Sequence, residues 1–159
     1  MLTPPIIVSD PPGQPAPQGQ LAAGAFWPVI DLEALRKAVA IDSSVTVQRL
    51  EHATTEALAT VIDQLAEWAA AHQAAGADSL AAVPAMAING CSVQVLRFQR
   101  AVYAYAKANI TERYAADDAT GRAERGEESR RTQAEEYRRD GLYAVRDILG
   151  VPRMTSELI

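Results

Sequence analysis

The chain has 159 residues, 48% of them hydrophobic and 22% charged, which is enough to bury one sizeable core and form one domain. Aromatic residues make up only 6% while alanine is abundant, which favours closely packed helices over a sheet. One cysteine excludes an internal disulfide framework, and two lone histidines exclude a Cys/His zinc site. We therefore expect an all-α protein: a four-helix-type bundle with a short extra helix, a proline-rich N-terminal arm and an extended C-terminal tail.

Prolines dominate the beginning of the chain, since seven of the nine lie within the first 28 residues. Such a segment lacks backbone donors and helical periodicity, so we expect residues 1–30 to form a flexible arm. Its apolar cluster Phe26-Trp27-Pro28 can pack on the chain's own domain or on a neighbour, and we favour the former.

Two helices are predicted next. Asp31 is a suitable cap for a short helix that runs to about Ala40, and Ser43 or Ser44 can cap a long helix that runs to about Ala75. The long helix has the clearest stripe of the chain, with spacings of 3 and 4. Its members are Val47, Leu50, Thr54, Ala57, Val61, Leu65, Trp68 and His72.

Small residues, glycines and a proline between residues 76 and 92 predict a loop with one short turn of helix. A third helix is expected at about residues 93–115. Its buried face should comprise Leu96, Val102, Tyr103, Ala106, Ile110 and Tyr114, and its outer face Arg97, Arg100, Lys107 and Arg113.

Residues 117–121 are of types that favour a turn. A fourth helix is expected after them at about residues 124–149, with Gly150 as its C-cap and Pro152 beyond. Its predicted stripe is Ala134, Tyr137, Gly141, Ala144 or Val145, and Ile148. We therefore expect a helical domain over residues 31–150 and an extended tail over residues 151–159.

Charge is distributed unevenly, with a net −1 in residues 1–30, −5 in residues 31–92 and +1 in residues 93–159. No region is strongly basic, which argues against tight non-specific DNA binding. Five glutamates and five arginines alternate in the fourth helix between Glu124 and Arg139, as on a solvated helix face. Beside them, Gly141 marks a place where a neighbouring backbone or subunit could approach.

Catalytic and metal motifs are weak. Residues 121–126 have the glycine spacing of a phosphate loop, but Glu127 and Glu128 follow where Lys and Ser/Thr should stand. His52, His72 and Cys91 have no partners at ligand or catalytic spacing. We predict no catalytic, cofactor-binding or metal-ligating residues, and hence no enzyme.

Membrane association is not expected either. The longest apolar stretches, residues 21–30 and 80–88, fall short of the ~18 residues of a membrane span. The first basic residue is Arg36, so no basic region precedes an apolar core as in a signal peptide.

An ordered set of short motifs covers roughly residues 26–159 and resembles the head completion, or head stabilisation, protein of contractile-tailed temperate phages. The set comprises Phe26-Trp27-Pro28, Val45-Thr-Val-Gln-Arg-Leu50, Leu65-Ala-Glu-Trp68, Arg100-Ala-Val-Tyr103, Glu112-Arg-Tyr114, Asp118-Ala-Thr-Gly121, Tyr137-Arg-Arg-Asp140, Asp147-Ile-Leu-Gly150, Arg153 and Glu157-Leu-Ile159.

This resemblance implies a structural virion protein without cofactors. It would form a dodecameric ring in the neck, beneath the portal, after DNA packaging in the host cytoplasm. Its expected partners are the portal protein and a tail or neck completion protein, and DNA would pass through the lumen without specific binding. A generic helical scaffold of another machine is the alternative.

Two sets of contact residues follow for such a ring. The apolar tail residues Met154, Leu158 and Ile159 are too peripheral to be required by the domain's own core, so we expect the tail to anchor on the portal. The alternative is that the tail folds back onto its own helices. Its residues are Pro152, Arg153, Met154, Thr155, Glu157, Leu158 and Ile159. Arginine's fork suits carboxylates and carbonyls of a neighbouring chain, so we expect subunit contacts at Arg100, Arg113, Arg138, Arg139 and Asp140. For Arg138 and Arg139, pairing within the helix with Glu135 or Glu136 is the alternative.

Overall fold

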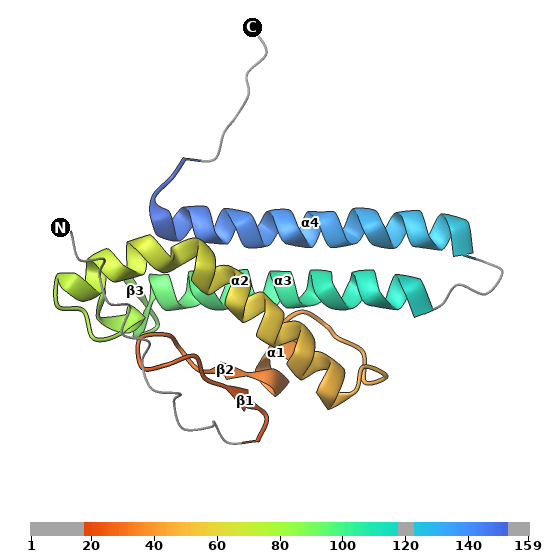
Figure 1. Cartoon of the computed structure of the whole chain (residues 1–159), viewed down its shortest axis with the longest axis horizontal. Coiled ribbons are helices and arrows are strands. Elements are labelled where there is room, and N and C mark those ends of the chain that lie inside the picture. Colours follow the sequence, from red (N-terminus) through yellow and green to blue (C-terminus); the bar gives the residue numbers. More distant parts are fainter. Residues whose placement is uncertain (1–17, 118–122, 153–159) are drawn as a thin grey trace, which may run out of the picture.

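The computed structural model describes residues 18–117 and 123–152 and is mainly helical, as predicted. Figure 1 labels its helices in chain order. They are α1 (Leu32–Ala38), α2 (Val47–Ala74), the 3-10 helix η1 (Leu80–Ala82), α3 (Val93–Asp117) and α4 (Ala123–Leu149).

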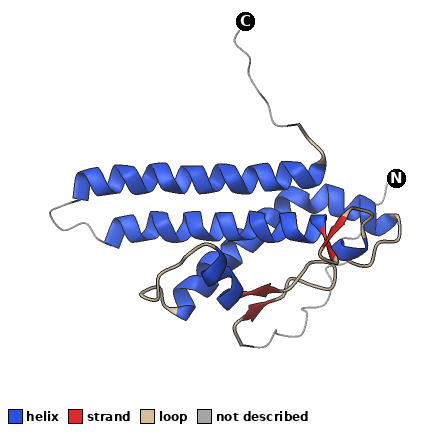
Figure 2. Cartoon of the chain, turned by 180° about the vertical axis from the view of Figure 1, so that it is seen from behind, coloured by secondary structure: helices blue, strands red, loops and turns tan. Residues whose placement is uncertain are grey.

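Two short antiparallel pairs of strands depart from the purely helical expectation (Figure 2). β1 (Gln20–Leu21) pairs with β2 (Ile30–Asp31), and β3 (Ala87–Ile88) pairs with β4 (Cys91–Ser92). Asn89 and Gly90 connect β3 to β4 with positive φ angles of 49° and 74°, as a two-residue hairpin turn requires. Each pair has only two residues per strand, so the strands fasten loops and form no layer of their own.

The helices form an antiparallel pair crossed by a third helix. α3 and α4 run side by side, and α2 crosses α3, while α4 packs chiefly on α3 (Figure 1). α1 has only seven residues. Three long helices therefore supply the body, in place of the four-helix-type bundle expected from the sequence.

Local capping sets where α1 and α2 begin. Asp31 caps α1 as predicted, because its carboxylate accepts a hydrogen bond from the Ala34 amide at 2.7 Å. The prediction of a serine cap for α2 was wrong. Thr46 is the cap and accepts from the Arg49 amide at 3.3 Å, while the Asp42 carboxylate binds the Ser44 amide at 2.7 Å and turns the preceding loop.

The stripe on α2 supplies much of the core, as the spacing predicted. Leu50, Ala57, Val61 and Leu65 are all buried, with Thr54 among them. Val47 is the exception at 53% exposed, because it is the first residue of the helix and lies beyond the packed surface. Trp68 and His72 are half-buried, with their ring centres 4.3 Å apart.

Residues 18–30, which were expected to be part of a flexible arm, are packed onto the helices. The Leu32 amide donates to the Gly19 carbonyl at 2.9 Å, and the Leu80 amide donates to the Phe26 carbonyl at 2.8 Å. Phe26 is buried, and the Trp27 ring stacks on Phe98 with 5.1 Å between ring centres. The prediction that Phe26 and Trp27 pack on their own domain is confirmed, whereas residues 1–17 lie outside the described residues.

The predicted face of α3 was incomplete because it omitted Phe98. This ring is fully buried and is the largest of the completely enclosed side chains among the described residues. Leu96 and Tyr103, expected inside, are only half-buried, and Lys107, expected outside, is half-buried as well. Helix α3 has partners on more than one side, so a single stripe does not describe its packing.

Candidate assembly interface

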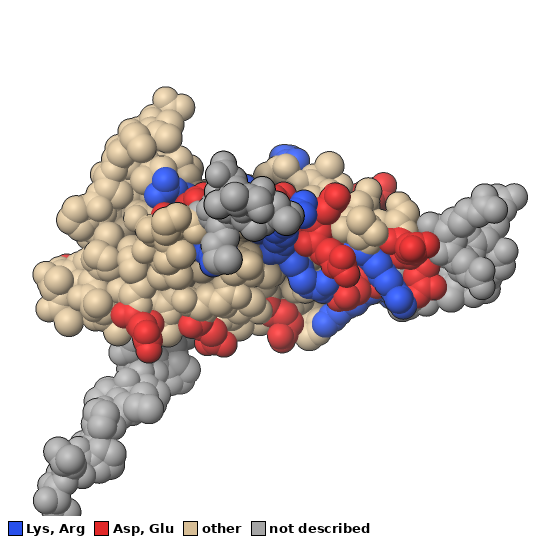
Figure 3. Space-filling view, turned by 90° about the horizontal axis from the view of Figure 1, so that it is seen from above, with Lys and Arg blue, Asp and Glu red and all other residues tan. Residues whose placement is uncertain are grey.

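Basic and acidic side chains are interleaved over one half of the face seen in Figure 3, and scattered charged groups lie on the other half. In contrast, no residue from Ser79 to Leu96 is charged, and this run forms η1, β3, β4 and the start of α3. The five expected subunit-contact residues all belong to α3 or α4.

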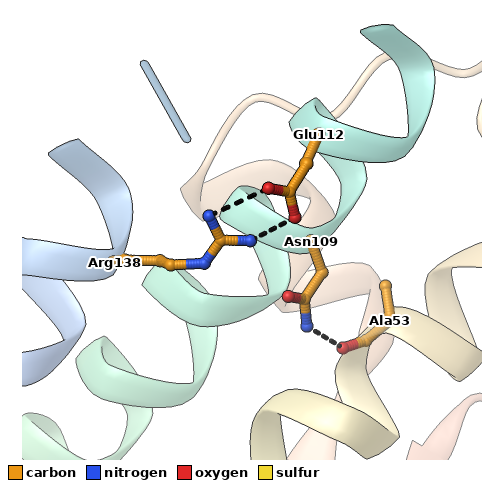
Figure 4. Close-up of polar contacts among 4 residues, drawn as sticks. All are labelled: Ala53, Asn109, Glu112 and Arg138. Atoms are coloured by element: carbon orange, nitrogen blue, oxygen red, sulfur yellow. Dashed lines mark hydrogen bonds and ion pairs between the residues drawn. The ribbon is translucent and has the colours of Figure 1, made fainter. Parts of the chain in front are cut away.

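Arg138 forms a two-pronged ion pair with Glu112 of α3 (Figure 4). Its Nη1 atom lies 3.2 Å from Oε1 of Glu112, and its Nη2 atom donates to Oε2. The side chains stay 36% and 53% exposed, respectively. Within the chain the partner is Glu112 and not Glu135 or Glu136 of the same helix, because the antiparallel α3–α4 register brings Glu112 opposite Arg138.

Arg100 is also engaged within the chain, near the opposite end of the pair. Its guanidinium lies 3.6 Å from the Asp147 carboxylate, and Arg97 donates to the Asp147 carbonyl at 3.2 Å. These contacts hold the start of α3 to the end of α4. Together with the Arg138 pair, they join the two helices at two separate points.

Arg113, Arg139 and Asp140 are exposed, as a contact to another subunit requires. No ion pair joins any of the three to another described side chain within residues 18–113 and 126–152. The structure therefore divides the five predicted residues into two that are paired across α3 and α4 and three that face solvent.

The close approach expected at Gly141 is made by the chain itself. The Tyr105 ring of α3 packs against this glycine, and a Cβ atom placed on Gly141 would lie 2.8 Å from two of the ring carbons. Of the two expected neighbours, another part of the backbone or a subunit, the structure places the chain's own helix α3 at this point. Glycine is needed here because α4 approaches a ring on α3, and the hydroxyl end of that ring receives a hydrogen bond from Gln64 of α2 at 3.2 Å.

Two polar contacts of α3 were not predicted from the sequence. Asn109 donates to the Ala53 carbonyl of α2 at 3.1 Å (Figure 4), and Lys107 donates to the Ala40 carbonyl at 3.1 Å. Partial burial lowers the pKa of Lys107, which lies 6.0 Å from the centre of the Tyr137 ring. No local pattern in the sequence signals either contact, because the partners Ala40 and Ala53 lie 67 and 56 positions away.

The last helix ends as predicted. Gly150 has a φ of +70°, and the Val151 amide donates to the Arg146 carbonyl at 3.0 Å, which is the Schellman hydrogen bond. Val151 and Pro152 are exposed, so the chain leaves the body here. Arg153, Met154, Thr155, Glu157, Leu158 and Ile159 lie outside the described residues.

Residues with catalytic or ligating chemistry do not converge in the described part of the chain. His52 is exposed on α2, His72 packs on Trp68, and Cys91 is half-buried in β4. Across residues 18–117 and 123–152, no group of three His, Cys, Asp or Glu side chains is placed to hold a metal ion.

Among the described helices, none combines the length and apolar character needed to cross a membrane. The phosphate-loop glycine Gly121 lies outside the described residues.

Comparison with known proteins places this architecture in a family. The family model for phage head completion protein (GPL) matches residues 21–159. A head completion/stabilization protein of Escherichia phage P2 is 35% identical over 128 residues, which cover 80% of this chain and 76% of that protein. No solved structure matches the chain significantly.

Proposed function

The chain belongs to the family of phage head completion proteins, and on this premise we propose that it forms a ring-shaped adaptor between the portal and the tail or neck after DNA packaging. Head completion and stabilisation in a phage is the function of this family, and its role is structural. The observation that carries the proposal is the extent of the family match, which includes every helix of the body and the C-terminal tail.

An adaptor needs a body that transmits contacts without deforming. The α3–α4 pair meets this need, because Arg100–Asp147 and Arg138–Glu112 join the two helices at separate points. Asn109 adds a link from α3 to α2. We assign the adaptor role to the helical domain of residues 31–150, with residues 18–30 as its packed extension.

The C-terminal tail is the proposed anchor on the portal. Gly150 ends α4, and the exposed Val151 and Pro152 follow at one end of the α3–α4 pair, which is where a tail over residues 151–159 would begin. Met154, Leu158 and Ile159 supply apolar side chains for pockets on a partner, while Arg153 and Glu157 can set the register.

Neighbouring subunits are proposed to meet through Arg100, Arg113, Arg138, Arg139 and Asp140. Arg139 is well suited to bind a neighbouring subunit, since it is exposed and has no ion pair with a described side chain. Arg100 and Arg138 already bind acids of their own chain, so a neighbour would share their remaining donors. Polar contacts of this kind are individually weak, and docking on a symmetric platform would make them cooperative.

DNA is proposed to pass through the ring without specific binding. The chain carries a net charge of −5, and its arginines alternate with glutamates in α4. A surface of this kind gains little from releasing counterions on a phosphate backbone. We propose a dodecameric ring in the virion neck, assembled in the host cytoplasm.

The test is binding to the cognate portal protein by a chain that lacks residues 154–159. We expect a folded, soluble protein that no longer binds the portal, with an unchanged far-UV circular dichroism spectrum. Undiminished binding by the shortened chain would refute the tail as anchor. Failure of the intact chain to bind portal in the same assay would favour the scaffold of another machine.

The subunit contacts are tested separately by Arg139→Glu, with Lys37→Glu as the matched charge reversal on α1. Lys37 is exposed, and the ion pair it forms among the described residues is with Glu33 of its own helix. We expect Arg139→Glu to impair assembly of necks seen by electron microscopy, while Lys37→Glu assembles normally and both keep their helix content. Normal necks with Arg139→Glu would show that this arginine is not an interface residue.

A further inference from the structure

A groove of about 460 Å³ lies between β1 and the outer surface of α2, which are labelled in Figure 1. Its walls are mainly apolar, with Leu21 and Ala23 on one side and Leu58, Ala59 and Ile62 on the other, and Asp63 contributes a carboxylate. Ala59 is exposed and Ile62 is half-buried, so the floor of the groove presents aliphatic surface to solvent. Such a surface is stabilised when apolar side chains cover it.

We propose that residues 2–8 of the same chain occupy this groove. Within the first 17 residues, Leu2, Ile6, Ile7 and Val8 are the large aliphatic side chains, and residues 2–8 contain no charged group. The composition of the segment therefore matches the groove walls. Covering Ala59 and Ile62 gives the N-terminal segment a role in the body of the protein, independent of the proposed adaptor function.

The connection is long enough for this arrangement. Residues 9–17 join the aliphatic segment to Gln18, which lies three positions before Leu21 in the groove wall. Nine residues span up to about 30 Å when extended, whereas residues 55–63 of α2 rise by only about 12 Å. Pro11, Pro12 and Gly13 lie between the two parts and favour a reversal of the chain.

The segment of the same chain is a better occupant than a second copy. Tethering through a short connection gives an effective concentration in the millimolar range, above that of a separate molecule at ordinary working concentrations. A neighbour would have to offer an apolar projection, and the exposed Met86 and Ile88 of the β3–β4 hairpin are the candidates for that alternative. The family match begins at residue 21, so the inference concerns a segment outside the matched range.

Methyl NMR on the full chain of 17.1 kDa tests the proposal directly. We expect nuclear Overhauser contacts between the methyl groups of Ile6, Ile7 or Val8 and those of Leu58 or Ile62, at intensities that do not change on dilution. In a mixture of differently labelled chains, these contacts should be absent between molecules. Contacts that appear only between molecules would overturn the proposal in favour of a second copy, and random-coil methyl shifts for residues 6–8 would overturn it outright.

Substitutions supply a second measurement. Ala59→Arg places a long charged side chain in the groove, whereas Ala71→Arg makes the same change at an exposed alanine about 120° around α2. In the full chain, Ala59→Arg should abolish the nuclear Overhauser contacts between residues 6–8 and Ile62, whereas Ala71→Arg should leave them at wild-type intensity. Equal contacts in the Ala59→Arg and Ala71→Arg proteins would contradict the groove as the binding site.

Discussion

The close packing of α4 on α3 at Gly141 predicts how the substitution Gly141→Ala changes the stability of the protein. Alanine has a higher helix propensity than glycine by about 0.5–1 kcal/mol, so Gly141→Ala alone should stabilise a helix interior. The added Cβ atom, however, would lie 2.8 Å from two carbons of the Tyr105 ring, which is 9% exposed and enclosed by the core. Overpacking of this kind costs about 1–3 kcal/mol. We expect a net loss of up to about 2.5 kcal/mol.

A double-mutant cycle separates the two effects. In a Tyr105→Ala background the ring is gone, so Gly141→Ala should stabilise the protein by about 0.5–1 kcal/mol. The coupling between the two sites should therefore be about 1–3 kcal/mol. Gly126→Ala is the matched control on α4, because a Cβ atom there would meet no atom within 4 Å. It should stabilise in both backgrounds.

Urea denaturation followed by far-UV circular dichroism measures each free energy of unfolding, with slopes compared to verify that unfolding stays two-state. Equal stabilisation by Gly141→Ala in the presence and absence of the Tyr105 ring would refute the reasoning. In that case α3 and α4 would not be held at the separation seen in the structure.

Further predictions concern the core, the helix cap, an inter-helix contact, acid stability and association. Leu65→Ala should cost about 2–5 kcal/mol in urea denaturation, since Leu65 is fully buried, and a loss below about 0.5 kcal/mol would show that it is not in the core. Thr46→Ala should cost about 0.5–2 kcal/mol through loss of the α2 cap, and Ser43→Ala, which removes the side chain first expected to cap, should cost less. Asn109→Ala should cost about 0.5–1.5 kcal/mol through loss of the bond to the Ala53 carbonyl, an effect that Asn109→Gln should not fully rescue. Hydrogen bonds from the Ser44 backbone and side chain lower the pKa of Asp42 below its ordinary value of 3.8, so the stability it contributes is present above that value and is lost as the pH falls through the lowered pKa. Asp42→Asn should therefore make unfolding less dependent on pH in that acid range, and an unchanged pH profile would contradict this assignment. Light scattering should find the isolated protein monomeric or weakly associated, and a stable dodecamer in high salt without portal would contradict a ring that depends on docking.

The sequence by itself determined the features that depend on neighbours along the chain. The apolar spacing from Leu50 to Leu65 located the buried side of α2, Asp31 marked the start of α1, and Gly150 marked the end of α4. Each of these rests on contacts within about four residues, such as a cap bond or one helical turn. Local chemistry is therefore readable before the fold is known.

Only the tertiary structure decided which distant residues meet. Arg138 binds Glu112, 26 positions earlier, and Gly141 accommodates Tyr105, because the antiparallel register of α3 and α4 places them opposite each other. In the same way, the packing of Trp27 on Phe98 anchors residues whose proline and glycine content predicted a flexible arm. Register and crossing are set by the packing of whole helix surfaces, and no local spacing encodes them.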